Sequence, residues 1–189
     1  MIKIKSILLK YYIYFISCAL CTPLFIMNIS ENQGWGGDFA QYILQAKNIV
    51  NGSSQSETGY IYNRNYPHLA PPVYPMGFPL LLSPIYFFCG NNITAFMILI
   101  SIFLLALVPV LIFYYSRNVS PLVSLFLVLI IIYNPWTIDL KSNILSDIPF
   151  TFFLFLSILL LVCLNKTNLF YSILTGILIG FLITIRTIG

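Results

Sequence analysis

The stretch "ITAFMILISIFLLALVPVLIFYY", residues 93 to 115, decides the class of fold to which this chain belongs. It contains no charged side chain and is long enough to cross the roughly 30 Å hydrocarbon core of a bilayer as one helix. The whole chain has the same character: 7% of its 189 residues are charged and 59% are hydrophobic. About a quarter of the residues of a soluble domain are charged. We therefore predict an all-α integral membrane protein.

Four further apolar runs are predicted to span the bilayer together with residues 93–115. The third run is short, but turn-forming residues bracket it, "SRNVSP" before and "NPW" after. The segment "LAPPVYPMGFPLLLSPIYFFCG" is also apolar, yet its prolines would break a spanning helix, so we predict a turn followed by a short interfacial helix. The predicted spans are residues 11–29, 93–115, 122–133, 148–164 and 169–185, with outer loops at 30–92 and 134–147.

The charged residues assign a side of the membrane to each loop. With a cytoplasmic N-terminus, the positive-inside rule puts Lys3, Lys5, Lys10, Arg117 and Lys166 inside, without any acidic residue among them. We therefore predict a multi-pass protein of a bacterial cytoplasmic membrane. The charges are too sparse for a nucleic-acid-binding surface. The residues predicted to lie outside are Glu31, Asp38, Glu57, Asp139, Asp147, Lys47, Arg64, Lys141 and Arg186.

The stretch "GWGGDFAQYILQAKNIVNG", residues 34 to 52, predicts an amphipathic helix on the membrane surface. Apolar residues recur from Phe39 to Val50 at helical spacing, and Gly52 is expected to end the helix. The opposite, polar face carries Gln41, Gln45, Lys47 and Asn48. Asp38 precedes this run, where a carboxylate is a good N-cap. The same carboxylate is also a candidate catalytic group.

Four stretches resemble, in order and in approximate spacing, the N-terminal half of the polytopic C-superfamily glycosyltransferases. This superfamily includes protein O-mannosyltransferases and the aminoarabinose transferases that modify lipid A. The stretches are "GGDFAQYILQAKNIVNG", "PPVYPMGFPLLLSPIYFFCG", "NILSDIPFTFFLFLSILLL" and "GILIGFLITIRTIG". The resemblance implies a membrane enzyme that moves a sugar from a polyprenyl-phosphate donor to a hydroxyl of a glycan, lipid or protein acceptor on the outer face.

The resemblance also implies which residues form the site. Asp38 matches the family's acidic residue in the first outer loop, Asp147 matches the second outer-loop acid, and Arg186 matches a basic residue that ends a Gly-rich span. Many members have Asp-Glu where this chain has Asp38 followed by Phe39, so the class of sugar stays open.

Chemistry gives these residues roles and alternatives. Asp38 would act as the general base for the acceptor hydroxyl. Asp147 would orient the acceptor or help to hold a divalent cation, or would only cap a helix. The charge of the leaving lipid phosphate would be met by Arg186, with Arg64 and Lys47 as further candidates. Arg186 could instead be an interfacial anchor.

Aromatic residues of the first outer loop, Tyr74 and Trp35 among them, could stack on a sugar or form an interfacial aromatic belt. The lone His68 has no metal partner in the sequence and is interpreted as a hydrogen-bonded or solvated side chain.

Two other functions stay open from the sequence, a non-catalytic membrane subunit and a fragment of a transporter. A transporter would place ionisable residues inside its spans, whereas here they lie at span ends or in loops. The resembled enzymes have about twice as many spans, so we expect a truncated or split enzyme that does not turn over alone. We also expect Gly176 and Gly180, a G-x-x-x-G pair, to let the helices approach one another closely.

Overall fold

The computed structural model describes residues 2–30, 38–61, 63–66, 71, 73–163 and 169–186, and every regular element in this part of the chain is an α-helix. The all-α prediction is confirmed. The predictions for Glu31, Trp35, His68 and Lys166 lie outside the described residues, as do those for the side chains of Lys3, Lys5 and Lys10. The helices are α1 (Ile2–Cys21), α2 (Pro23–Ile26), α3 (Phe39–Asn51), α4 (Gly77–Cys89), α5 (Ile93–Tyr115), α6 (Pro121–Ile132), α7 (Pro135–Lys141), α8 (Asp147–Cys163) and α9 (Leu169–Ile185).

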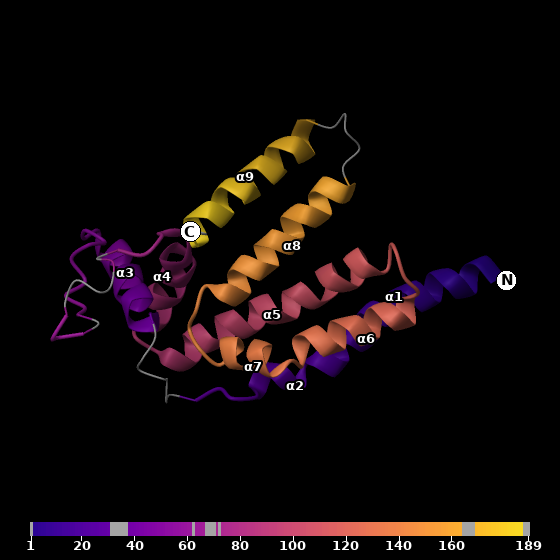
Figure 1. Ribbon diagram of the computed structural model, residues 1–189, viewed down its shortest axis with the longest axis horizontal. Coiled ribbons are helices and arrows are strands. Elements are labelled where there is room, and N and C mark those ends of the chain that lie inside the picture. The colour runs from indigo at the N-terminus through magenta and orange to yellow at the C-terminus, as the bar shows by residue number, and fades with distance from the viewer. Residues whose placement is uncertain are drawn as a thin grey trace.

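Helix α5 is the centre of the bundle, and its bounds are the predicted ones. It packs against α8 on one side and against α1 and α6 on the other, so its core positions Phe96, Ile100, Val108 and Ile112 are fully buried. Helices α8 and α9 form an antiparallel pair beside it (Figure 1). Half of the apolar stretch of α5 is buried and Ile102 is exposed, so packing accounts for only part of its apolar circumference.

Within the described residues, α5 is long and apolar enough to cross a membrane by itself. Helices α6 and α7 pass the same test only as a pair, with a bend of 58° between them. The other apolar helices are shorter. The predicted loop at 134–147 omits α7, which begins at an N-cap where the Asn134 side chain accepts a hydrogen bond from the Trp136 N–H (2.9 Å) and Pro135 follows.

The first predicted span differs from the structure at both ends. Helix α1 already begins at Ile2 and stops at Cys21, and the short α2 follows after Thr22. Pro23 has no N–H to donate to the preceding turn, so the helix breaks there. The Thr22 hydroxyl donates to the Cys18 carbonyl (2.9 Å) at the break.

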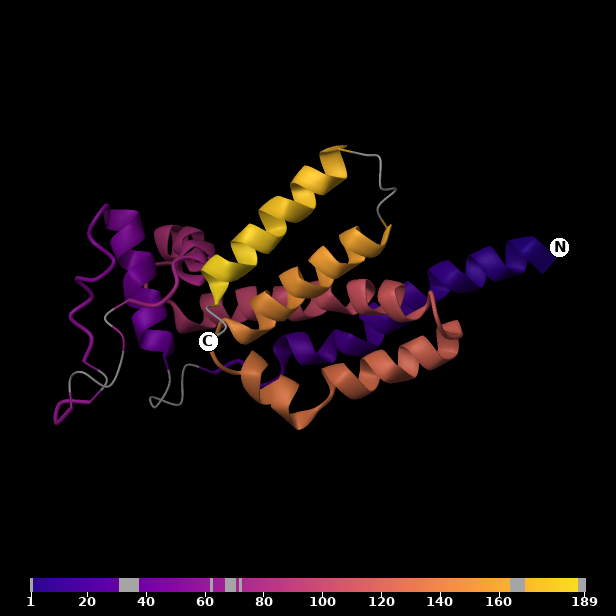
Figure 2. The same cartoon turned by 45° about the horizontal axis from the view of Figure 1, so that its top comes forward.

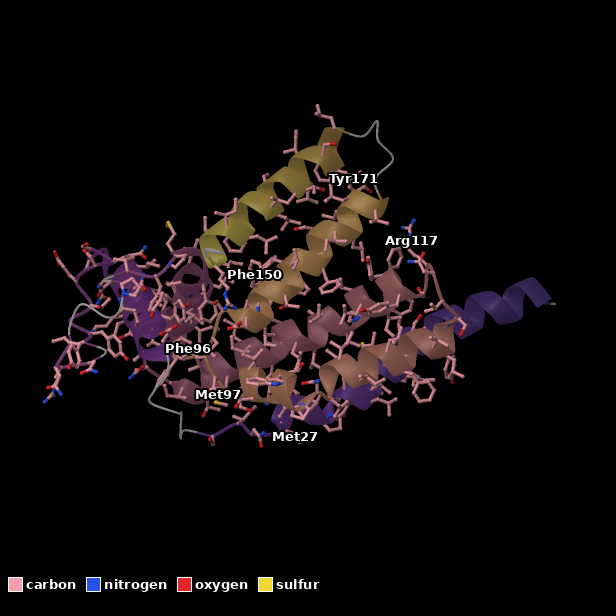
Figure 3. All side chains as sticks on the ribbon, viewed as in Figure 1. Met27, Phe96, Met97, Arg117, Phe150 and Tyr171 are labelled. Carbon is pink, nitrogen blue, oxygen red and sulfur yellow. The ribbon has the colours of Figure 1, made fainter. Side chains whose placement is uncertain are left out.

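The described acidic residues gather at one end of the bundle, together with basic residues. Arg117, in the α5–α6 turn, lies at the same end as the start of α1, whereas Met27, Phe96 and Met97 lie toward the opposite end (Figure 3). Helices α3, α4 and α7, the start of α8 and the end of α9 gather at that opposite end in both ribbon views (Figures 1 and 2). The acidic residues of the described part belong to these elements and to the segment between α3 and α4: Asp38, Glu57, Asp139 and Asp147.

Helix α3 lies where the sequence predicted it and ends at Gly52, which adopts the left-handed conformation (φ +67°) that favours glycine. Its apolar face packs on α4. The expectation for its polar face is partly wrong, because Gln41, Gln45 and Asn48 are buried and only Lys47 is exposed.

Hydrogen bonds explain this burial. The chain after α3 folds back over the helix, where the Thr58 hydroxyl donates to Gln41 Oε1 (3.1 Å) and Asn48 Nδ2 donates to the Ser54 carbonyl (2.8 Å). Buried polar side chains are stable when they are paired in this way.

A close approach of α4 and α9 fixes the two elements beside each other. A Cβ atom at Gly77 would lie only 2.5 Å from Thr184 Oγ1 and 2.6 Å from the Thr184 carbonyl carbon, so no larger residue fits. The G-x-x-x-G pair does not have the expected role in the described part of the chain, since a Cβ atom at Gly176 or Gly180 would meet nothing within 4 Å.

Candidate functional site

A cavity of about 170 Å³ lies where four separate segments meet, at the end of the bundle that carries α3, α4 and α7. The segments are the start of α3, the residues just before α4, the α7–α8 connection with the start of α8, and the end of α9. Four residues proposed from the sequence line this cavity, whereas Arg64 and Lys47 are exposed and do not. Its lining residues are Asp38, Tyr42, Tyr74, Pro75, Leu145, Ser146, Asp147 and Arg186.

Asp38 does not cap α3. Its backbone is helical (φ −76°, ψ −4°), and its side chain makes no cap hydrogen bond. An N-cap residue normally has extended dihedral angles that let its side chain reach the N–H groups of the first turn. Instead the carboxylate Oδ1 accepts a hydrogen bond from the Tyr74 hydroxyl (2.7 Å), so the capping interpretation is wrong.

Tyr74 is held in place by the side chain of Gln45. The Gln45 amide Nε2 donates to the Tyr74 carbonyl (3.0 Å), while Gln45 Oε1 accepts from the Tyr74 N–H (3.1 Å). Gln45 is completely buried and also donates to Gln55 Oε1 (3.1 Å). This two-point contact fixes the backbone from which the Tyr74 phenol reaches Asp38.

The environment keeps the Tyr74 phenol protonated. Burial raises its pKa above the usual value of 10.0, and the hydrogen bond to the Asp38 carboxylate and the charge of that carboxylate raise it further. A protonated phenol donates to Asp38, which keeps the carboxylate in a fixed orientation.

Tyr42 connects α3 to the other side of the cavity. Its ring packs against the rings of Tyr74 (centroids 5.0 Å apart) and Phe78 (4.9 Å, edge to face). Burial raises the pKa of Tyr42, while a hydrogen bond with the buried Ser146 lowers it. The sequence did not point to Tyr42, Ser146 or Gln45 as site residues. Tyr42 belonged to the predicted apolar face of the helix, and Gln45 belonged to its predicted polar face.

Asp147 and Arg186 form an ion pair across the cavity. Asp147 is the first residue of α8, and Arg186 directly follows α9. The ion pair therefore connects the start of α8 to the end of α9. The Arg186 side chain is 48% exposed and that of Asp147 is 26% exposed. A pair this open to solvent adds little stability. The guanidinium group has five N–H donors, and more than one acceptor can therefore bind it.

The residues that line the cavity do not form a metal centre. Among the described residues, no three His, Cys, Asp or Glu side chains come together as metal ligands would. The two carboxylates of the cavity are instead engaged by a phenol and a guanidinium group.

Comparison of the chain with protein-family models found no match, and comparisons with curated proteins and with solved structures found none either.

Proposed function

We propose that this protein is a membrane glycosyltransferase that moves a sugar from a polyprenyl-phosphate donor to an acceptor hydroxyl on the extracytoplasmic face. One observation carries the proposal. Asp38, Tyr74, Asp147 and Arg186, far apart in the chain, line a single cavity that combines a carboxylate with a guanidinium group. A general base and an anion-binding group are the two parts that this transfer requires. The resemblance to the C-superfamily glycosyltransferases supports the same roles.

In the proposed reaction, the Asp38 carboxylate removes the proton of the acceptor hydroxyl. The acceptor oxygen forms a bond to the anomeric carbon, while the bond from that carbon to the phosphate oxygen breaks. The electron pair of the broken bond leaves with the lipid phosphate, whose charge is met by Arg186. Tyr74 orients Asp38 through its hydrogen bond, and Asp147 orients Arg186 through the ion pair. No step is assigned to a metal ion.

The proposal includes a multi-pass membrane protein of the bacterial cytoplasmic membrane, with the N-terminus in the cytoplasm. The sequence supports this orientation, because five of the nine basic residues fall on the predicted inner side without any acidic residue among them. Arg117, one of these five, lies at the same end of the bundle as the start of α1 (Figure 3). Single cysteines at the exposed positions Ser53 and Asn118, in a variant without native cysteines, test it. A membrane-impermeant maleimide is expected to label position 53 but not position 118 in intact cells. Labelling of position 118 from outside would overturn the orientation.

Donor recognition is tested with residues 1–189 in nanodiscs by native mass spectrometry. The phosphate contact of Arg186 predicts that a polyprenyl-phosphate sugar binds more tightly than the matching polyprenyl alcohol. Arg186→Gln removes a charged hydrogen-bond donor, so donor affinity is expected to fall about ten- to hundredfold. The matched control is Arg64→Gln, because Arg64 is exposed and lies outside the cavity. Equal binding of the alcohol and the phosphate sugar would contradict the proposal.

Catalysis is tested in native membranes that contain the protein. Asp38→Asn keeps the shape of the side chain but removes the base, so sugar transfer is expected to fall about 10²- to 10⁴-fold while donor binding is retained. Glu57→Gln, at an exposed acid outside the cavity, is the control. Near-normal transfer by Asp38→Asn would show that Asp38 is not the base.

A further inference from the structure

The cavity around Asp38 is smaller than typical sites for small molecules. Such sites have volumes of about 300 to 1,000 Å³, whereas this cavity measures about 170 Å³. It can hold the reacting groups but not a whole acceptor. The structure contains a second and larger pocket, of about 680 Å³, between α7 and the chain that follows α2. We call it the α7 pocket.

The α7 pocket is separate from the cavity and adjacent to it. Asn143 lines the α7 pocket and Leu145 lines the cavity, and two residues of chain span at most about 7 Å. Between them, the side chain of Ile144 is fully buried and anchors the connection. The Leu145 N–H donates to the Asn143 carbonyl (3.0 Å) and tightens the turn. A ligand that occupies the α7 pocket and extends along this turn would therefore approach the residues that line the cavity of Asp38.

The rim of the α7 pocket is held in a defined position. Lys141 of α7 is fully buried and donates to the Met27 carbonyl, which fixes the chain directly before Asn28. Asn28 turns that chain in the left-handed region (φ +54°), which non-glycine residues seldom adopt, and it lines the pocket. The Lys141 ammonium group is thereby engaged away from the pocket.

The lining of the α7 pocket indicates the chemistry of its ligand. Asn143 donates its amide to the Asp139 carbonyl (2.8 Å), which leaves Asn143 Oδ1 as an acceptor next to the exposed Asp139 carboxylate. The Ser142 hydroxyl donates its proton to the Ile138 carbonyl (2.7 Å), so it offers only an acceptor lone pair to the pocket. Asn28 adds an amide, and Ile138 adds an apolar surface. No described lining residue is positively charged, so phosphate is not the ligand that this pocket favours. Acceptor atoms, an amide and a small apolar surface match the hydroxyl groups and the C–H face of a sugar.

We propose that the α7 pocket binds a neutral, polyhydroxylated acceptor, a carbohydrate, and presents its terminal hydroxyl to Asp38. The inference rests on the proposed function, because it names the acceptor class of the same reaction. It makes Asp139 and Asn143 acceptor-binding residues outside the cavity that holds the reacting groups.

The test measures binding of oligosaccharides without any lipid donor. Residues 1–189 in nanodiscs are screened by saturation-transfer NMR against a library of neutral oligosaccharides of one to four sugar units. At least one member is expected to bind saturably. Asp139→Asn and Asn143→Ala each remove a hydrogen-bond acceptor oxygen from the lining of the α7 pocket. Each is expected to weaken oligosaccharide binding about tenfold. Glu57→Gln and Asn51→Ala, at exposed positions outside the pocket, are matched controls that should leave binding unchanged.

Thermal unfolding of each variant separates loss of binding from loss of folding, and Asp139→Asn keeps the side-chain shape at an exposed position. Binding of no library member would overturn the inference, as would binding that both pocket variants retain. Displacement of the sugar by spermidine at low concentration would identify a cation site and would also overturn it. The Asp38→Asn variant is expected to bind the sugar normally, so failure of the catalytic proposal and failure of the acceptor pocket give different results.

Discussion

The contact between Gly77 and Thr184 makes a quantitative prediction. In Gly77→Ala, the new Cβ atom would lie 2.5 Å from Thr184 Oγ1, 2.6 Å from the carbonyl carbon and 2.7 Å from the carbonyl oxygen of Thr184. Two of these three atoms belong to the α9 backbone, so no side-chain rotation relieves the overlap and the helices must separate. Overpacking of this kind costs about 1–3 kcal/mol, which is about a five- to 150-fold decrease in the folding equilibrium constant. Because Arg186 follows Thr184 by two residues, the same shift moves Arg186 away from Asp38.

The assay is reversible unfolding of the protein in mixed micelles, titrated with SDS and followed by circular dichroism. Gly176→Ala and Gly180→Ala are the controls, since a Cβ atom at either position meets nothing within 4 Å. Alanine is a better helix former than glycine by up to about 1 kcal/mol, so these variants are expected to be as stable as the natural protein or slightly more stable. If Gly77→Ala were as stable as these controls, the close approach of α4 and α9 would be wrong.

Three further predictions concern single contacts near the two pockets. Gln45→Leu leaves the Tyr74 N–H and carbonyl without their partner, so the free energy of unfolding is expected to fall by about 1–3 kcal/mol in the same SDS titration. For Tyr74→Phe, the free energy of unfolding is expected to fall by less. Because the pKa of Tyr74 is raised in the folded protein, the stability that this phenol contributes is fully present below pH 10.0. It is lost progressively as the pH rises from 10.0 through the raised pKa of the folded state. Burial raises the pKa of Tyr42 as well, so tyrosinate absorbance should appear later for more than one phenol in the natural protein than in the unfolded chain. Tyr74→Phe should reduce that late phase by the amplitude of one phenol. Burial lowers the pKa of Lys141 from 10.5, so the unfolded chain binds more protons between the lowered pKa and 10.5. Stability should rise with pH across that window, and Lys141→Met should flatten the rise in urea titrations at several pH values.

Local signals in the sequence were sufficient for some of the helix boundaries. Residues 93–115 and the end of α3 at Gly52 were predicted correctly, because an uninterrupted apolar run and a glycine stop each depend on neighbouring residues only. Helix α7 had a local signal too, Asn134 followed by Pro135, but it lies in a segment interpreted as a loop between spans.

Tertiary contacts explain what the sequence did not reveal. Asp38 precedes α3 as a cap residue does, yet its carboxylate is used by Tyr74, 36 residues later in the chain. Gln45 occupies a position on the polar face of α3, where solvent exposure is expected. It is buried because Tyr74, 29 residues later in the chain, returns to it and forms hydrogen bonds with its side chain. Nothing near "PMGFP" indicates that Gly77 meets Thr184, since that contact depends on how α4 and α9 cross. The resemblance implied that Asp38, Asp147 and Arg186 belong to one site. It did not indicate which side chains form hydrogen bonds or ion pairs with them.

If the protein spans a membrane as proposed, the bend between α6 and α7 has a consequence for the surrounding lipid. Twelve residues of α6 extend about 18 Å, which is roughly 12 Å less than the hydrocarbon core of a typical bilayer. In the proposed orientation, the 58° bend at Asn134 turns α7 aside and keeps Asp139 and Lys141 from continuing along the axis of α6. Lipids beside a short helix thin to match it, at a cost of fractions of a kcal/mol per Å. The protein would thus draw the headgroup layer inward on the side of α7, and a lipid-linked substrate that diffuses there would carry its phosphate deeper than it lies in the surrounding membrane.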